Sequence, residues 1–179
     1  MSAPRTFKFL AAGARGPVSG FRWPAPGTWV EVEGAIEPCV RGAHVCRVGD
    51  LPYWLHDELW EMELRGQVIE ADDCLVAQSA RLVRRFEAWQ HDGARNFVAA
   101  CAEHAAALVA EAAPESRELA QGYIEDAREC AEASVVAFGA FSAAVAVGKL
   151  APAAQAIQAY RRERAWQSEW LARCVIGGN

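Results

Sequence analysis

The sequence predicts an α+β fold: a small, mostly antiparallel sheet in the N-terminal half, packed with an Ala-rich helical bundle of about three helices in the C-terminal half. Two observations predict it. From residue 5 to about residue 90 the chain is punctuated by Gly and Pro, and its apolar residues alternate as in short strands. From about residue 94 they recur at helical spacing. We expect a Trp-rich α+β sheet subdomain over residues 1–92 and a helical subdomain over 93–179, together forming one compact unit.

The first half contains several short alternating runs, each bounded by turn residues. A Gly- and Pro-rich loop follows the first run, at residues 15–27. Asp50 as a helix cap, with Pro52 in the first turn, predicts one or two helical turns. The run "LWEMELRG" is expected to end at Gly66. The predicted strands are 5–11, 28–34, 43–48, 59–66 and one or two within 74–89.

The second half is expected to form three helices. The first covers residues 94–113 and is broken by Pro114, the second runs from 114 to 148, and the third begins at Pro152 and stops at Gly177. The uncharged stretch from Ala133 to Gly148 is shorter than the roughly 20 residues that a membrane span needs. We therefore interpret it as a buried helix.

Composition narrows the classes of partner and compartment. Hydrophobic residues make up 53% and charged residues 23%, which is enough for a core, and the net charge is −5. An acidic chain with a pI of about 5.4 is not expected to bind nucleic acid. Its start carries no apolar run typical of a signal peptide, so we expect a cytoplasmic protein with six reduced cysteines and no membrane association.

The stretch "PCVRGAHVC" presents the sharpest chemical question. Cys39, His44 and Cys46 are ligand types that zinc prefers, although no second ligand pair follows at the usual spacing. On a strand His44 and Cys46 share a face, which also suits a thiol and its base, or two buried structural side chains. All three interpretations, metal site, catalytic pair and structural turn, stay open.

Other candidate ligand-contacting residues lie nearby in the sequence. Aromatic residues, among them Trp23, Tyr53 and Trp54, could stack a flat ligand, with Arg22 between two of them. Glu61 and Glu63 place two carboxylates on one strand face, where repulsion could raise one pKa and where either could orient His44. Residues of an aromatic core or of a solvent-facing strand would show the same patterns.

The helical half offers a weaker metal alternative. Cys101 and His104 share a helix face, and Cys130 and Cys174 could approach them from the other helices. The motifs of phosphate-binding loops, dinucleotide-binding folds, zinc proteases and serine hydrolases are missing from the chain.

Two resemblances add to these residue-level hypotheses. The order "GFRWP", "PCVRGAHVC", "DLPYWL" and "LWEMELRG", followed by "RERAWQSEWLARCV", resembles an uncharacterised family of actinobacterial proteins, which implies no activity. At the level of the fold the chain is similar to ADP-ribosyltransferase-like domains. That similarity implies an NAD site made of Arg5 or Arg22, the "GAHVC" step, Tyr53 and Glu61 or Glu63. The hydroxyl-rich strand of the arginine-specific members is missing.

Two functions follow as hypotheses. The first is a binding or interaction module, with a protein partner, a second copy of the chain or a small-molecule ligand. The second is a small enzyme, or a nucleotide- or NAD-binding protein, with its site around His44, Cys46, Tyr53 and Glu61 or Glu63. Zinc held by Cys39, His44 and Cys46 is a further alternative. Zinc or a nucleotide is thus the expected kind of cofactor.

Overall fold

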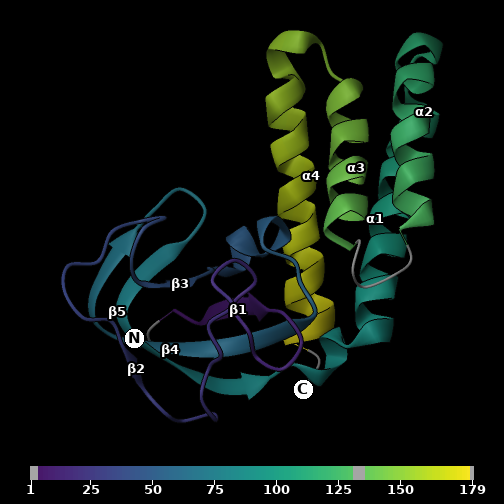
Figure 1. Cartoon of the computed structure of the whole chain (residues 1–179). Coiled ribbons are helices and arrows are strands. Elements are labelled where there is room, and N and C mark those ends of the chain that lie inside the picture. Colours follow the sequence, from purple (N-terminus) through teal and green to yellow (C-terminus); the bar gives the residue numbers. More distant parts are fainter. Residues whose placement is uncertain (1–3, 131–135, 178–179) are drawn as a thin grey trace. The chain divides into compact units, whose positions relative to one another are not determined.

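The computed structural model describes residues 4–130 and 136–177 and divides into two compact units, with the boundary between Gln90 and His91. The first unit contains an antiparallel sheet and the second contains helices, so the predicted α+β class is confirmed. Figure 1 shows the elements of both units.

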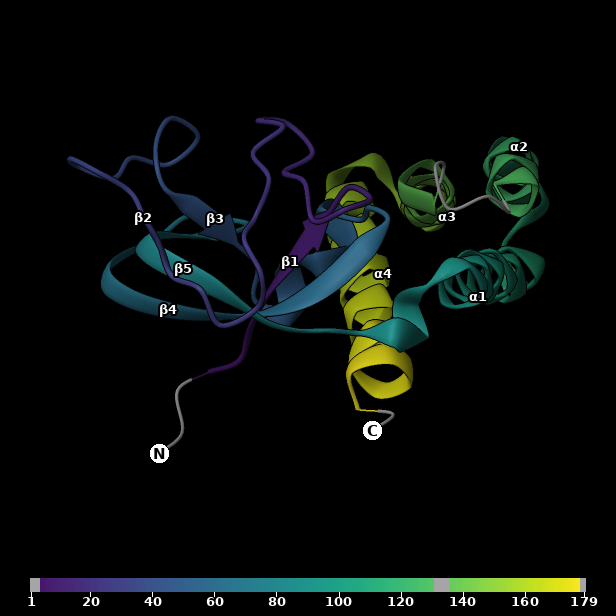
Figure 2. The same ribbon diagram turned by 60° about the horizontal axis from the view of Figure 1, so that its bottom comes forward.

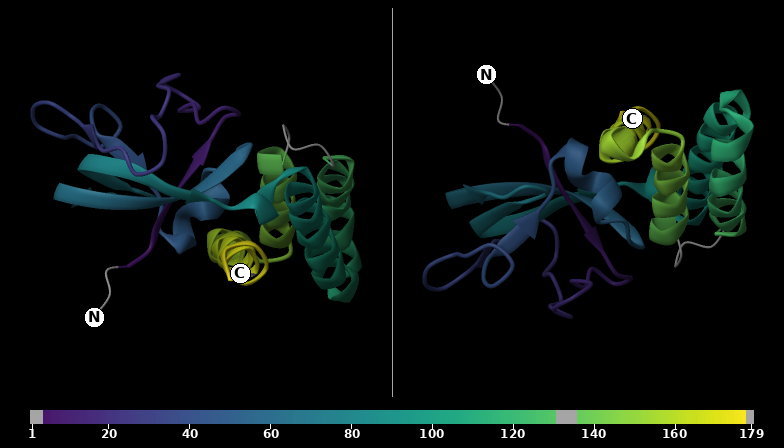
Figure 3. Two further views of the ribbon diagram at one scale, coloured as in Figure 1. Left: turned by 90° about the horizontal axis from the view of Figure 1, so that it is seen from below. Right: turned by 90° about the horizontal axis from the view of Figure 1, so that it is seen from above.

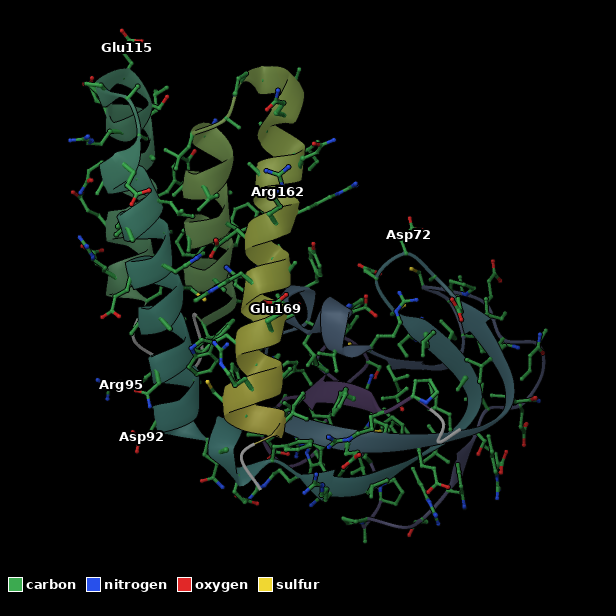
Figure 4. The ribbon with its side chains drawn as sticks, turned by 180° about the vertical axis from the view of Figure 1, so that it is seen from behind. Asp72, Asp92, Arg95, Glu115, Arg162 and Glu169 are labelled. Carbon is green, nitrogen blue, oxygen red and sulfur yellow. The ribbon has the colours of Figure 1, made fainter. Side chains whose placement is uncertain are left out.

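The first unit is built on one long hairpin, β4–β5, that pairs with all the other strands. Its strands are antiparallel and follow the order β1-β4-β5-β2, with β3 also paired to β5. Asp72 marks the turn between β4 and β5 (Figure 4). The elements are β1 (Thr6–Leu10), β2 (Val30–Glu31), β3 (Ala43–Val45), the 3-10 helix η1 (Val48–Tyr53), β4 (Glu58–Glu70), β5 (Leu75–Arg85) and the 3-10 helix η2 (Glu87–Trp89).

The strand pairings of this unit close into a ring. Phe7 in β1 and Cys46, which directly follows β3, exchange two backbone hydrogen bonds of 2.9 and 2.6 Å. The pairings therefore run from β1 through β4, β5 and β3 and return to β1. The loops that precede β2 and β3 lie on one side of the β4–β5 hairpin (Figure 2).

Both faces of β1 are covered. Phe7 and Phe9 are buried and pack against the rings of Phe86 and Trp89, with centroids 5.9 and 5.0 Å apart. The opposite face carries Leu10, which belongs to a cluster of buried residues on β1, β3, β4, β5 and the long first loop. Successive side chains of a strand alternate between faces, so the side chain before Leu10 on that face is Lys8.

The structure corrects three details of the predicted first half. The run 28–34 forms a strand only at β2. Gly66, with φ of +77°, lies at a bulge inside β4 rather than at its end, because the pairing register shifts between Arg65 and Val68. Asp50 is not the cap of η1: it is the third helical residue, and its carboxylate accepts a hydrogen bond of 2.9 Å from the backbone N–H of Arg47.

The second unit contains four long helices in its described residues rather than three, because the predicted helix 114–148 is two helices. α2 buries Ala120, Ile124 and Ala127, and it packs against α3, which buries mainly alanines and glycines. Two adjacent helices bury these faces against each other, which one straight helix could not do. The long helices are α1 (His91–Glu111), α2 (Pro114–Glu129), α3 (Val136–Lys149) and α4 (Ala156–Leu171), with short helices η4 (Ala153–Gln155) and η5 (Ala172–Ile176) beside α4.

Small residues allow the helices of this unit to approach closely (Figures 1 and 3). A Cβ added at Gly139 would lie 2.8 Å from Cβ of Cys130 and 3.1 Å from Val98. Charged side chains such as Glu115, Arg162 and Glu169 lie on the outer sides of the helices (Figure 4). No helix in the described ranges has the length and apolar character needed to cross a membrane. The stretch from Ala133 to Gly148 is a largely buried helix from residue 136 onward, and its first three residues lie outside the description.

Candidate functional site

A cavity of about 770 Å³ opens within the first unit. Its walls come from β1, β2, β3, the loops before β2 and β3, Trp54 directly after η1 and Cys74 directly before β5. Most of the lining is apolar, and the polar side chains are few. The lining residues are Lys8, Phe9, Gly16, Pro17, Val18, Ser19, Phe21, Trp23, Val30, Glu31, Val32, Glu33, Cys39, Val40, Arg41, Gly42, Ala43, His44, Val45, Cys46, Trp54 and Cys74.

Lys8 is the central polar group of this cavity. Its ammonium donates a hydrogen bond of 2.5 Å to the backbone carbonyl of His44 and lies 5.9 Å from the centroid of the Trp23 ring. None of the ion pairs among the described residues includes Lys8. Burial therefore lowers the pKa of Lys8 below its ordinary value, since the charged form has lost water without gaining a carboxylate.

Two thiols, Cys46 and Cys74, lie near Lys8. Both are buried, and burial raises the pKa of each thiol above its ordinary value. A nucleophilic cysteine needs the opposite shift, because the thiolate is the reactive form. The cavity contains Cys46, as the catalytic hypothesis expected, but in an environment that keeps it protonated.

His44 holds the turn that precedes β3. Its Nε2 accepts a hydrogen bond of 3.0 Å from the backbone N–H of Cys39, so its Nδ1, 3.1 Å from the carbonyl of Gly42, is the nitrogen that carries the proton. Burial, with a smaller effect from the charge of Lys8, lowers the pKa of His44. A neutral imidazole with both nitrogens bonded inside the turn acts as a structural clamp.

The backbone of the same turn accounts for two other residues of the motif. Cys39 has a φ of +62°, and Gly42 has a φ of +142°. A Cβ at Gly42 would overlap Cγ1 of Val76 on the neighbouring strand. The turn therefore requires glycine at position 42, both for its backbone conformation and for the close approach of β5.

The predicted zinc site is not formed. Within residues 4–130 and 136–177 no group of three or more His, Cys, Asp or Glu side chains is placed to hold a metal ion. Cys39 is exposed and Cys46 is buried, and His44 between them uses both ring nitrogens within the turn. All three residues line the cavity, but their donor atoms are not grouped as the ligands of one metal ion.

Aromatic and aliphatic side chains form the apolar part of the cavity. Trp23 and Trp54, two of the candidate ligand contacts, line it, and Phe21 meets Trp23 edge to face at 5.7 Å. At the cavity, Val18 is 95% exposed, Val40 70% and Phe21 47%. These three exposed apolar side chains border a hollow that is itself apolar. Phe21 belongs to the aromatic group that the sequence indicated as a possible ligand surface, whereas no sequence pattern indicated Val18 or Val40.

The other predicted site residues lie outside the cavity lining. Arg22 and Tyr53 are exposed. Glu61 accepts hydrogen bonds from Arg5 and Arg84, and Glu63 from Arg81. The prediction of a raised pKa in this pair is wrong for Glu61, because the hydrogen bond from Arg5 and its other arginine contacts lower its pKa.

The second unit contains a separate polar cluster around Glu163 of α4. His104 Nδ1 is 2.9 Å from Oε2 of Glu163, and the imidazole stacks on Trp166 at 3.9 Å. Burial raises the pKa of Glu163, against smaller opposing effects of His104 and Gln167. Cys101 is buried near this pair but Cys174 is exposed, so the predicted four-ligand set does not assemble.

The residue that the sequence analysis missed is Lys8. The run "TFKFL" pairs two phenylalanines on one face, which suggests that the lysine between them faces solvent. No sequence pattern marks the loops that cover its face. Comparison with known proteins finds no matching family model, no matching curated protein and no matching solved structure.

Proposed function

We propose that the first unit is a binding module for a small, largely apolar molecule, held in the cavity with its polar group directed at Lys8. The observation that carries the proposal is a partly buried amine, in no ion pair among the described residues, in a mostly apolar cavity of about 770 Å³. Ligand pockets in proteins have this size and this character: apolar walls with a few convergent polar groups.

Exposed apolar side chains add support. Val18, Phe21 and Val40 are large hydrophobic residues that face solvent beside the cavity. Contact with the tail of an apolar ligand would remove them from water, and such exposed apolar patches commonly mark ligand grooves or interfaces.

The nucleotide or NAD alternative has less support. A pyrophosphate favours several cations or a helix N-terminus. Lys8 and Arg41 are the cations of the lining, and Glu31 and Glu33 add negative charge there. Four residues proposed to contact NAD, Arg22, Tyr53, Glu61 and Glu63, are not part of this lining.

A direct test measures ligand binding by the full chain, with thermal shift and tryptophan fluorescence as the two readouts. We expect decanol to raise the unfolding temperature and to change the emission of Trp23 and Trp54, whereas NAD has little effect. Val40→Asp should weaken decanol binding about tenfold or more, since burial of a Val side chain is worth roughly 1.5–3 kcal/mol.

The matched control is Val83→Asp. Val83 is also an exposed valine of the same unit, but it does not line the cavity. If decanol, other apolar alcohols and 1-anilinonaphthalene-8-sulfonate all failed to bind, the proposal would be refuted. A response to NAD alone would instead favour the nucleotide alternative.

A protein-binding role of the second unit is a second proposal. Leu119 on α2, Phe138 on α3 and Ile157 on α4 are each more than half exposed, which is unusual for side chains of this size. Size-exclusion chromatography with light scattering tests whether the full chain associates with itself. A monomer at all concentrations would contradict self-association.

A further inference from the structure

We propose that Lys8 Nζ captures an apolar aldehyde or ketone in the cavity as an imine, an inference that rests on the proposed binding function. Lys8 on β1 is partly buried, lines the cavity and donates a hydrogen bond to a backbone carbonyl. This placement presents an amine, rather than an ion pair, to a molecule that enters from the apolar side.

The chemistry requires no partner beyond the carbonyl compound. The lone pair of Nζ forms a C–N bond to the carbonyl carbon, and the C=O π electrons move to oxygen, which takes a proton. The C–O bond then breaks, oxygen leaves as water with the two protons that Nζ has lost, and nitrogen forms the C=N bond. Nothing is oxidised or reduced.

The surroundings favour this reaction at Lys8. Attack needs the neutral amine, and burial without a carboxylate partner lowers the pKa of Lys8 in that direction. The nearby thiols compete poorly as nucleophiles because burial raises the pKa of Cys46 and Cys74. Trp23, close to the amine, adds an aromatic face against which an apolar tail can pack.

The chain offers an internal control. Lys8 and Lys149 are its only lysines, and all its other cationic side chains apart from histidine are arginines, which stay protonated and do not form imines. Lys149 is exposed at the end of α3 and belongs to the other unit. Its reactivity reports the behaviour of an ordinary surface amine.

The experiment treats the full chain with decanal and sodium cyanoborohydride, which reduces an imine to a stable secondary amine. Trypsin digestion and mass spectrometry then quantify alkylation at each lysine. Alkylated Lys8 blocks cleavage and appears in the peptide of residues 6–15. We expect Lys8 to be alkylated about tenfold or more faster than Lys149.

Three controls sharpen the result. Excess decanol, which binds but has no carbonyl group, should suppress alkylation of Lys8 and leave that of Lys149 unchanged. Lys8→Arg should abolish the rapid reaction, and Lys149→Arg should retain it. The comparison of the two lysines within the wild-type chain remains decisive even if one variant folds poorly.

Two outcomes would overturn the inference, and they are distinguishable. If decanol binds but Lys8 reacts no faster than Lys149, the imine is refuted and the binding function stands. If decanol does not bind and Lys8 shows no preference, the imine and the proposed function fail together.

Discussion

Lys8 in the first unit is partly buried and Glu163 in the second is fully buried, and the surroundings of these two ionisable side chains differ. Glu163 is bonded to His104, stacked beside Trp166 and close to Gln167, all on helices of its own unit. Lys8 bonds to one backbone carbonyl and otherwise faces a cavity. Glu163 has one paired oxygen, since its Oε1 has no hydrogen-bond partner among the described residues, but the carboxylate is enclosed by side chains of its own unit. A group enclosed in this way has a structural role, whereas one that lines a cavity is available to a ligand.

The network around Glu163 extends along α4. Arg164 donates hydrogen bonds to the hydroxyl of Tyr160 and to Oε1 of Gln167, and Gln167 donates to the carbonyl of Ala140 on α3. This network joins α3 and α4, which also meet through the rings of Phe141 and Tyr160, with centroids 6.2 Å apart. We therefore assign the cluster a structural role and place the functional site in the first unit.

The largest expected effect concerns the wall of the cavity. Gly42→Ala should destabilise the chain by about 2–4 kcal/mol, because the new Cβ both overlaps Val76 and occupies a backbone conformation that suits only glycine. Chemical denaturation measures this. Gly49→Ala is the control, since an added Cβ there has no neighbour within 4 Å. Equal stability of the two variants would show that the turn is not rigid.

The next largest effect is expected at Glu163, the buried carboxylate of the second unit. His104→Ala should destabilise the chain by about 2 kcal/mol, because it leaves the carboxylate of Glu163 buried without its partner. The double variant His104→Ala with Glu163→Gln should recover much of that loss, since no buried charge remains. Denaturation curves of the four proteins in this cycle give the coupling. Strictly additive effects would contradict the described pairing.

Lys8→Met should behave in the opposite way. It removes an amine whose burial disfavours the charged form, so we expect the chain to keep its stability or gain about 1 kcal/mol. The same variant should lose its rapid reaction with decanal. A large loss of stability would mean that Lys8 is structural, like His104, and would remove the contrast between the two regions.

The smallest expected effect is a pH dependence from His44. Its pKa is lowered in the folded chain, so the unfolded chain binds the proton more readily. Stability is then fully present above the unfolded pKa of about 6.5 and declines as the pH falls below it. Thermal unfolding from pH 7.5 to pH 5.5 should show a steeper decline in wild type than in His44→Gln. An identical decline of the unfolding temperature with pH in the two proteins would contradict the structural role of His44 in the turn.

Much of the fold could be predicted because its signals are local. The alternation in "TFKFL" and the spacing of apolar residues in 94–113 identified β1 and α1. The division of 114–148 into α2 and α3 could not be predicted, since both parts keep helical periodicity and the break depends on packing between helices. The bulge at Gly66 likewise depends on the register with β5.

The candidate site was only partly accessible from sequence. His44, Cys46, Trp23 and Trp54 were predicted and line the cavity, whereas Lys8 was missed. A lysine between two phenylalanines looks like the exposed side of a strand. It is partly buried here because long loops cover that face, and which face a loop covers is a property of the whole unit. The stretch "PCVRGAHVC" forms a turn that the His44 imidazole holds through two hydrogen bonds, and this turn forms one wall of the cavity.

The pairing between Phe7 and Cys46 is the shortest pairing in the ring of strands, because it consists of two backbone hydrogen bonds. It lies one residue from Lys8. A ligand larger than the cavity could be accommodated if these two hydrogen bonds break while the β4–β5 hairpin stays paired. Short strand pairings open at a lower free energy than long ones. We expect the amide hydrogens of Phe7 and Cys46 to exchange with deuterium earlier than those of the hairpin. A bound ligand should slow the exchange of these two amides.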